Sequence, residues 1–187
     1  MALARGFKSW ANKLADDTRQ EIGVGKFDQL DPRVLAEYLG IPIYDLSFFQ
    51  KVAPSVSHLL NDEPEVFSAV TVFDWPKRFI VHNDRHHWKR QNSNLCHELS
   101  HGLLHHPPTP ALDDKRDRIW NGDLEEEANL LAGCLLIGKD AAFAIAKGNW
   151  SISSASNHFG ASEVMVNYRV NATGSRKIVS RIEASRI

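Results

Sequence analysis

The chain contains, at positions 97 to 101, the sequence His97-Glu98-Leu99-Ser100-His101, in which a glutamate follows the first of two histidines. On a helix, positions i and i+4 lie on one face, so the two imidazoles can bind a single Zn²⁺. Glu98 can then reach a water on the same ion and act as the general base of a hydrolase. The pattern therefore predicts a helix that carries a catalytic metal site.

The flanking sequence predicts that this helix is packed. An apolar stripe runs beside the histidine face and consists of Leu95, Leu99, Leu103 and Leu104. We expect an amphipathic helix over about residues 88–106, ended by the prolines that follow. The alternative is a surface helix with two solvated histidines. It is weaker, because half-buried histidines need partners.

Composition limits the class of protein. A chain of 187 residues with a net charge of −1 suits one domain and argues against bulk binding to nucleic acid or an anionic membrane. Cys96 and Cys134 form no disulfide framework. No apolar run has the length of a membrane span, and the N-terminus turns polar too early for a signal peptide. We expect a cytoplasmic protein.

The order of elements predicts an α+β fold. We expect helices over residues 5–22 and from Asp31-Pro32 to Gly40, then strands over 41–46, 66–73 and 78–82. After the motif helix and a polar loop over 107–121, Asp123 is expected to cap a helix over 124–137, with Glu126 completing a capping box. Three shorter helices should follow, with breaks near Gly148, at 160–162 and at Gly174.

We therefore predict a zincin-like single domain over residues 1–187, with a small mixed β-sheet packed on the motif helix and helices at both ends. Within it, residues 1–50 form the N-terminal helices and first strand. Residues 51–147 form the catalytic core, and residues 148–187 form C-terminal helices that look like a helix-turn-helix.

A catalytic zinc usually takes three protein ligands, so a third ligand is needed. The acidic start of the helix after the motif offers Glu125, Glu126 and Glu127. Glu125 shares its face with Ala128, Asn129 and Ala132, whose small side chains would let the helix approach the motif helix closely. We choose Glu125, and expect Asn129 to orient a ligating histidine through its second ring nitrogen.

His105 and His106 are the alternative third ligands. His97, His101 and His105 lie at i, i+4 and i+8, which spreads them over about 12 Å of helix and surrounds one ion poorly. The other histidines show no ligand spacing. His82, His86 and His87 precede the motif and could line a cleft, although we expect solvated positions for them.

Several segments resemble the ImmA/IrrE-type metallopeptidases. HELSHGLLHH at 97–106, followed by EEEANLLAGCLLIG at 125–138, is similar to the family's HE-x-x-H-x-LLHH and E-x-x-A-N motifs. Residues 31–46, 78–90 and 158–170 are similar to the family's leading helix and strand, its hairpin and its C-terminal helix pair. The sequence departs from the family at Ser100, at 93–96 and at 137–138, without losing a ligand.

The resemblance implies His97, His101 and Glu125 as metal ligands and Glu98 as catalytic base. It offers Tyr168 and Arg169 as donors to the oxyanion, beside the alternatives of ordinary packing and a surface salt bridge. Zn²⁺ is the implied cofactor, and Mn²⁺ the alternative, because such sites accept several divalent ions. Known members are bacterial and often linked to phage or mobile elements. The best understood cleave a helix-turn-helix repressor, or act beside a toxin–antitoxin or stress response.

The resemblance therefore implies a metallo-endopeptidase that cleaves a repressor or an antitoxin. Its substrate would add as a strand to an edge of the sheet. Two other classes stay open: a non-catalytic metal-binding interaction module, and a DNA-binding regulator. Residues 152–170 have the helix, turn and helix of a DNA-binding motif, but the second helix offers few base-reading side chains, so we do not expect nucleic acid as a partner.

Overall fold

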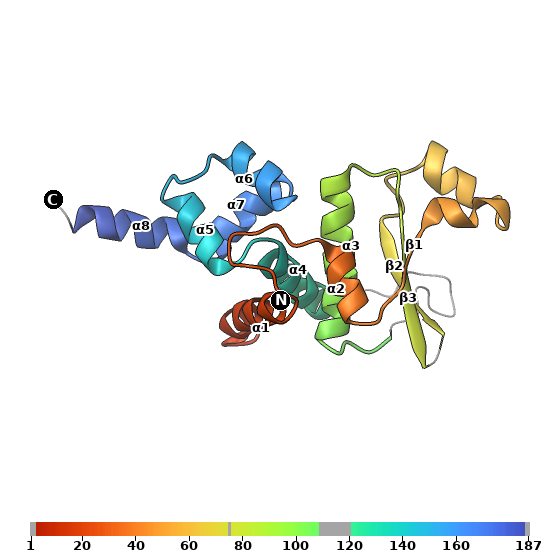
Figure 1. Ribbon diagram of the computed structural model, residues 1–187, viewed down its shortest axis with the longest axis horizontal. Helices are drawn as coiled ribbons and strands as arrows, with labels where there is room; N and C mark the ends of the chain where they lie inside the picture. The colour runs from red at the N-terminus through yellow and green to blue at the C-terminus, as the bar shows by residue number, and fades with distance from the viewer. Residues whose placement is uncertain (1–2, 75, 109–120, 186–187) are drawn as a thin grey trace.

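The computed structural model describes residues 3–74, 76–108 and 121–185. Helices dominate, and the three strands of a small sheet come after the second and before the third α-helix in chain order (Figure 1). In chain order the elements are α1 (Phe7–Glu21), α2 (Pro32–Tyr38), β1 (Ile43–Asp45), η1 (Leu46–Lys51), η2 (His58–Asp62), β2 (Ala69–Asp74), β3 (Lys77–His82), α3 (Trp88–Leu103), α4 (Gly122–Leu136), α5 (Lys139–Ala146), α6 (Ile152–Phe159), α7 (Glu163–Ala172) and α8 (Ser175–Ala184).

The sheet is mixed and three-stranded, in the order β1-β3-β2. β1 runs parallel to β3 and β2 runs antiparallel to it, so that Ile43 and Thr71 both lie opposite Ile80. Figure 1 shows α3 between this sheet and the group of helices that contains α4. The α+β prediction is confirmed in its coarser form: the chain is mostly helical, with one small mixed sheet packed against the motif helix.

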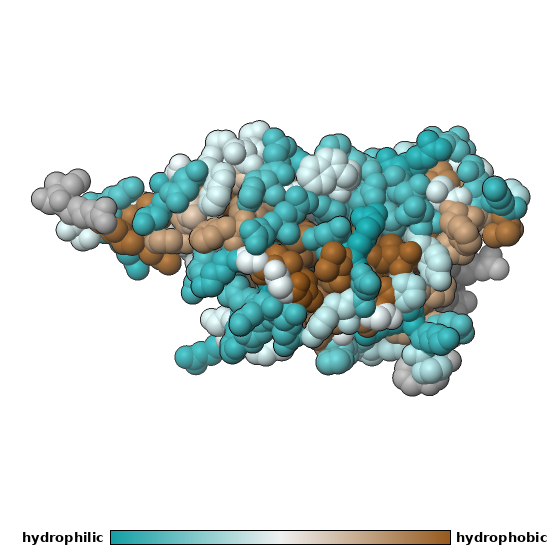
Figure 2. Space-filling view, in the orientation of Figure 1, coloured by the Kyte–Doolittle hydropathy of each residue, from teal (hydrophilic) through white to brown (hydrophobic). Residues whose placement is uncertain are grey.

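The core forms where α3 and α4 pack against each other. Leu95 and Leu99 of α3 are fully buried, as the apolar stripe predicted, and so are Leu131 and Leu135 of α4. α1 packs on the same helix α4, and its Ala11 and Ala15 belong to the same buried cluster. The apolar side of the motif helix thus faces the interior. In the space-filling view hydrophilic side chains cover most of the visible face, and apolar ones show near its centre and along α8 (Figure 2).

Gly133 allows α4 to approach α7 closely. A Cβ atom placed on this glycine would lie 2.8 Å from Arg169 Cδ and 3.2 Å from Met165 Sδ. Both side chains belong to α7, so only a residue without a side chain leaves room for them. This contact fixes how α4 lies against the C-terminal helices.

The start of α4 corrects one prediction. Asn121, and not Asp123, is the N-cap: its side chain accepts hydrogen bonds from the backbone nitrogens of Asp123 and Leu124, at 3.2 and 3.5 Å. Asparagine caps a helix as well as aspartate does, so the helix begins earlier and the capping box with Glu126 does not form. At α2 the prediction was right, because Asp31 accepts from Arg33 N at 2.9 Å with Pro32 at the first helical position.

Four helices follow α4 in the described part of the chain, where three were expected. The predicted breaks are correct, since Gly148, Gly160 and Gly174 all have positive φ. Three breaks separate four helices, because α5 begins directly after Gly138, with a bend of 70° from α4. Among the described residues no single helix has the length and apolarity of a membrane span; α4 and α5 together meet that test by length and composition only.

Candidate metal centre

α3 brings the two histidines of the motif together. His97 Nε2 and His101 Nε2 lie 3.1 Å apart, and the side chains are 21% and 23% exposed. The opposite side of the helix is buried through Leu95 and Leu99, so the histidines are held at the edge of the core. The helical spacing of the motif therefore gives two nitrogen donors directed at one point.

α4 supplies the third donor from its first turns. Glu125 Oε2 lies 3.1 Å from His97 Nε2, and Glu125 Oε1 lies 3.6 Å from His101 Nε2. One atom from each of these three residues lies within 4.8 Å of the others. Ligand atoms about 2.1 Å from a tetrahedral zinc are about 3.4 Å from one another, so the three side chains fit a single ion.

A second contact orients His97. Its Nδ1 lies 3.0 Å from Asn129 Oδ1, one turn after Glu125 on α4. Because an amide oxygen only accepts, Nδ1 carries a hydrogen, and in the neutral ring Nε2 has the lone pair that a metal ligand needs. Ala128 and Ala132, the small residues on this face, are buried, so α4 lies close to α3 as the sequence predicted.

Glu98 lies beside the triad and is tied to the sheet. Its Oε2 accepts a hydrogen bond from Thr71 Oγ1 of β2 at 2.6 Å. Burial raises the pKa of Glu98, while the bond from Thr71 opposes that rise. Thr71 could not be identified from the sequence, because a threonine in a β-strand is common and carries no spacing signal.

Electrostatics differ between the two histidines. Burial and the neighbouring His97 lower the pKa of His101 to about 4, so His101 is neutral at pH 7. Burial alone would lower the pKa of His97, but the hydrogen bond to Glu125 and the nearby Glu98 outweigh it and raise that pKa. His101 thus has the neutral form that a metal ligand requires, whereas His97 must give up its proton to Glu125 or to solvent when a metal binds.

The two residues suggested as oxyanion donors lie in different surroundings. Tyr168 is 40% exposed and lines, together with Glu125 and Asn129, a cavity of about 800 Å³. Arg169 is fully buried, and donates from Nε to the Ile137 carbonyl at 2.9 Å and from Nη2 to Asn12 Oδ1 at 2.8 Å. The structure thus gives Arg169 partners in the core and none at the triad. The catalytic roles of both residues stay predictions.

The histidines after the motif do not join the triad. His106 Nδ1 lies 2.9 Å from His101 Nδ1, whereas Glu125 contacts the other nitrogen of the His101 ring, Nε2. His105 forms the turn that ends α3, with φ of 53°. Ser100, one of the departures from the family pattern, is buried and donates to the Cys96 carbonyl at 2.7 Å, so it leaves the histidine face unchanged.

Two of the histidines expected in solvent are buried instead. His82 Nε2 pairs with Asp45 Oδ1 at 2.8 Å, and His86 Nε2 with the Pro64 carbonyl at 2.8 Å. The prediction was wrong because each ring finds a polar partner that makes burial tolerable. His87 is exposed, as expected; it caps α3 by accepting from Lys89 N at 3.3 Å and lines the cavity that contains Tyr168.

Comparison with known proteins agrees with this geometry. Residues 36–171 match the family model described as Peptidase_M78, IrrE N-terminal-like domain. A comparison with curated proteins gives no match. The matched region contains the whole triad, Glu98, the sheet and most of the C-terminal helices. Membership of this family implies a metallopeptidase, and its enzymes are typically zinc-dependent. The chain belongs to the IrrE N-terminal-like domain family of peptidases.

Proposed function

We propose that this protein is a zinc-dependent metallo-endopeptidase that cleaves a regulatory protein, such as a helix-turn-helix repressor or an antitoxin. The observation that carries the proposal is the convergence of His97, His101 and Glu125 next to Glu98. We also propose a zincin-like core and a cytoplasmic location, which rest on the sequence and the family resemblance.

The donor set supports zinc. Two imidazoles and one carboxylate form the catalytic His₂Glu set, which leaves a coordination position open for a water or a substrate. A divalent ion held by this triad would act as a Lewis acid and would lower the pKa of the attacking water. Manganese is the alternative occupant.

Glu98 is suited to move the proton. Its carboxylate takes a proton from the attacking water and then gives it to the nitrogen of the departing amine. Burial raises its pKa, which favours the protonated form that it needs when it acts as the acid. Thr71 holds one carboxylate oxygen and so fixes the orientation of the group.

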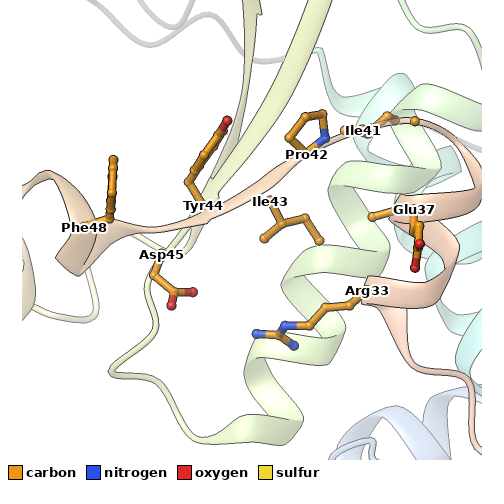
Figure 3. A pocket seen from close by; sticks show the side chains of 10 residues that line it. Arg33, Glu37, Ile41, Pro42, Ile43, Tyr44, Asp45 and Phe48 are labelled. Carbon is orange, nitrogen blue, oxygen red and sulfur yellow. The ribbon is translucent and has the colours of Figure 1, made fainter.

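The sheet offers two edges to a substrate. β2 is an edge strand among the described residues and contacts Glu98 through Thr71, so an extended peptide added there would lie next to the base. At the other edge, Tyr44 and Phe48 line a hollow of about 760 Å³ together with Arg33 and Glu37 of α2, and none of the triad residues lines it (Figure 3). We therefore assign the substrate to the β2 edge. Tyr168 is our candidate donor to the developing oxyanion.

The experiment is the substitution Glu98→Gln. The zinc-loaded protein is incubated with purified candidate helix-turn-helix repressors and antitoxins from its source organism, and fragments are followed by mass spectrometry. We expect wild type to cleave, and Glu98→Gln to retain zinc while cleaving on the order of a thousandfold more slowly.

His97→Ala is the matched control and should lose zinc as well as cleavage. Cleavage that survives in Glu98→Gln would reject the peptidase mechanism. If the unchanged protein binds one of these regulators without cutting it, the non-catalytic interaction module is correct. Salt-dependent binding to duplex DNA alone would instead favour the DNA-binding regulator.

A further inference from the structure

A chain of polar contacts lies behind His101 and has no role in the proposal above. His101 Nδ1 contacts His106 Nδ1 at 2.9 Å, and His106 Nε2 contacts Glu127 Oε2 at 3.2 Å. The His106 side chain is only 6% exposed, and Glu127 is 25% exposed. A buried imidazole is thus bridged between a candidate metal ligand on α3 and a carboxylate on α4.

The turn after α3 places His106 there. The His106 backbone N–H donates to the His101 carbonyl at 3.0 Å, and the His105 N–H donates to the Gly102 carbonyl at 3.2 Å. These two bonds form a Schellman motif, whose central residue must adopt the left-handed conformation. His105 fills that position with φ of 53°, and it is the one non-glycine residue with positive φ in the part of the chain that the structure describes. The turn folds the backbone back, so that His106 reaches the ring one turn earlier.

The order of donors and acceptors fixes the tautomer of both rings. A carboxylate only accepts, so His106 must carry its hydrogen on Nε2, which faces Glu127. Its Nδ1 then accepts, and His101 must carry its hydrogen on Nδ1. The lone pair of His101 is left on Nε2, the atom that faces His97 and Glu125.

We propose that Glu127 and His106 are positioning residues that fix the ring orientation and tautomer of His101 for metal binding. This proposal rests on the proposed metal site. Each histidine ligand then has its own orienting partner on α4. Asn129 contacts His97 directly, and Glu127 acts on His101 through His106. Loss of such outer partners typically weakens metal binding by 10- to 100-fold.

The test measures the dissociation constant of zinc by chelator competition, together with the thermal unfolding of the metal-free chain. We expect Glu127→Ala and His106→Phe each to bind zinc about 10- to 100-fold more weakly. Because Glu127 acts through His106, the double variant should bind zinc as His106→Phe does. A purely structural role would lower the melting temperature of the metal-free chain and leave the zinc affinity of the folded chain unchanged.

Two controls match these variants. Glu126→Gln removes a charge one residue earlier on α4, and His105→Gly keeps the left-handed turn; both should bind zinc like wild type. Wild-type zinc affinity in Glu127→Ala and His106→Phe would overturn this proposal alone, and additive losses in the double variant would also overturn it. A wild-type chain that binds no zinc would overturn the proposed function as well.

Discussion

Polar side chains gather at both ends of α4, but they make different kinds of contact at the two ends. Near the N-terminal end, Glu125 and Asn129 meet the two histidines of α3. At the C-terminal end, two buried arginines meet carbonyl groups: Arg19 Nη1 donates to Leu135 O at 2.6 Å, and Arg169 Nε to Ile137 O at 2.9 Å.

The difference separates a reactive cluster from a structural one. At the C-terminal end, donors pair with the carbonyls that a helix leaves without partners, and cations are favourable there. At the N-terminal end, the two Nε2 atoms and a carboxylate face a common point, an arrangement that a cation would stabilise. The predictions below test whether the two ends are separable in this way, beginning with the largest expected effect.

Removing the Glu125 carboxylate should weaken zinc binding and leave the fold of the chain intact. Glu125→Ala takes one of three donors from the site, so we expect zinc affinity to fall on the order of a thousandfold. Chelator competition measures this loss. The separation of the two ends would be refuted if the variant lost its helical circular dichroism together with its zinc.

Removing a buried arginine should have the reverse effect. Arg169→Met leaves the Ile137 carbonyl and Asn12 without their charged donor, and we expect a loss of about 3 kcal/mol in the free energy of unfolding. Urea denaturation measures it. Zinc affinity of the folded variant should equal that of wild type; a catalytic role for Arg169 would instead require lost activity at unchanged stability.

The N-terminal end should also respond to pH. The pKa of His101 is about 4 in the folded chain, against the ordinary histidine value of 6.5, so between these values the unfolded chain binds a proton that the folded chain does not. Stability of the metal-free protein should therefore fall as pH decreases from 6.5 to 4, by about 3 kcal/mol from this residue. Denaturation at several pH values, compared with His101→Gln, isolates the contribution; identical slopes would contradict it.

The smallest effect is expected from the outer support of His97. Asn129→Ala removes the acceptor at His97 Nδ1 and should weaken zinc binding about tenfold, with little change in stability. Asn129→Asp keeps an acceptor and serves as the control, which should retain zinc affinity. Equal losses of zinc affinity in both variants would show that Asn129 acts through packing and not through its hydrogen bond to His97.

Local spacing made most of this site predictable from the sequence. The i, i+4 histidines, the small residues around Glu125, and Asn129 one turn later all depend on one helical repeat. Thr71 and the contact between His106 and Glu127 were not predictable, because they join segments whose approach depends on the tertiary fold. Neither the sheet nor the turn at His105 leaves a periodic signal.

The pair Tyr168-Arg169 shows where a motif stops being informative. Adjacent positions on a helix point about 100° apart, so one side chain lines the cavity while its neighbour enters the core. The resemblance could offer both residues but could not choose between these directions. The polar loop expected over 107–121 lies largely outside the described residues, and the three-part division of the domain stays a prediction.

The close contact at Gly133 sets the tilt of α4 and therefore the position of Glu125. Glu125 lies eight residues away, about 12 Å along a rigid rod, so a tilt of about 5° at the glycine would swing its carboxylate by about 1 Å. Metal–ligand distances tolerate only about 0.2 Å. A single methyl group at position 133, remote from every reacting atom, would therefore displace the Glu125 carboxylate from its position at the metal site.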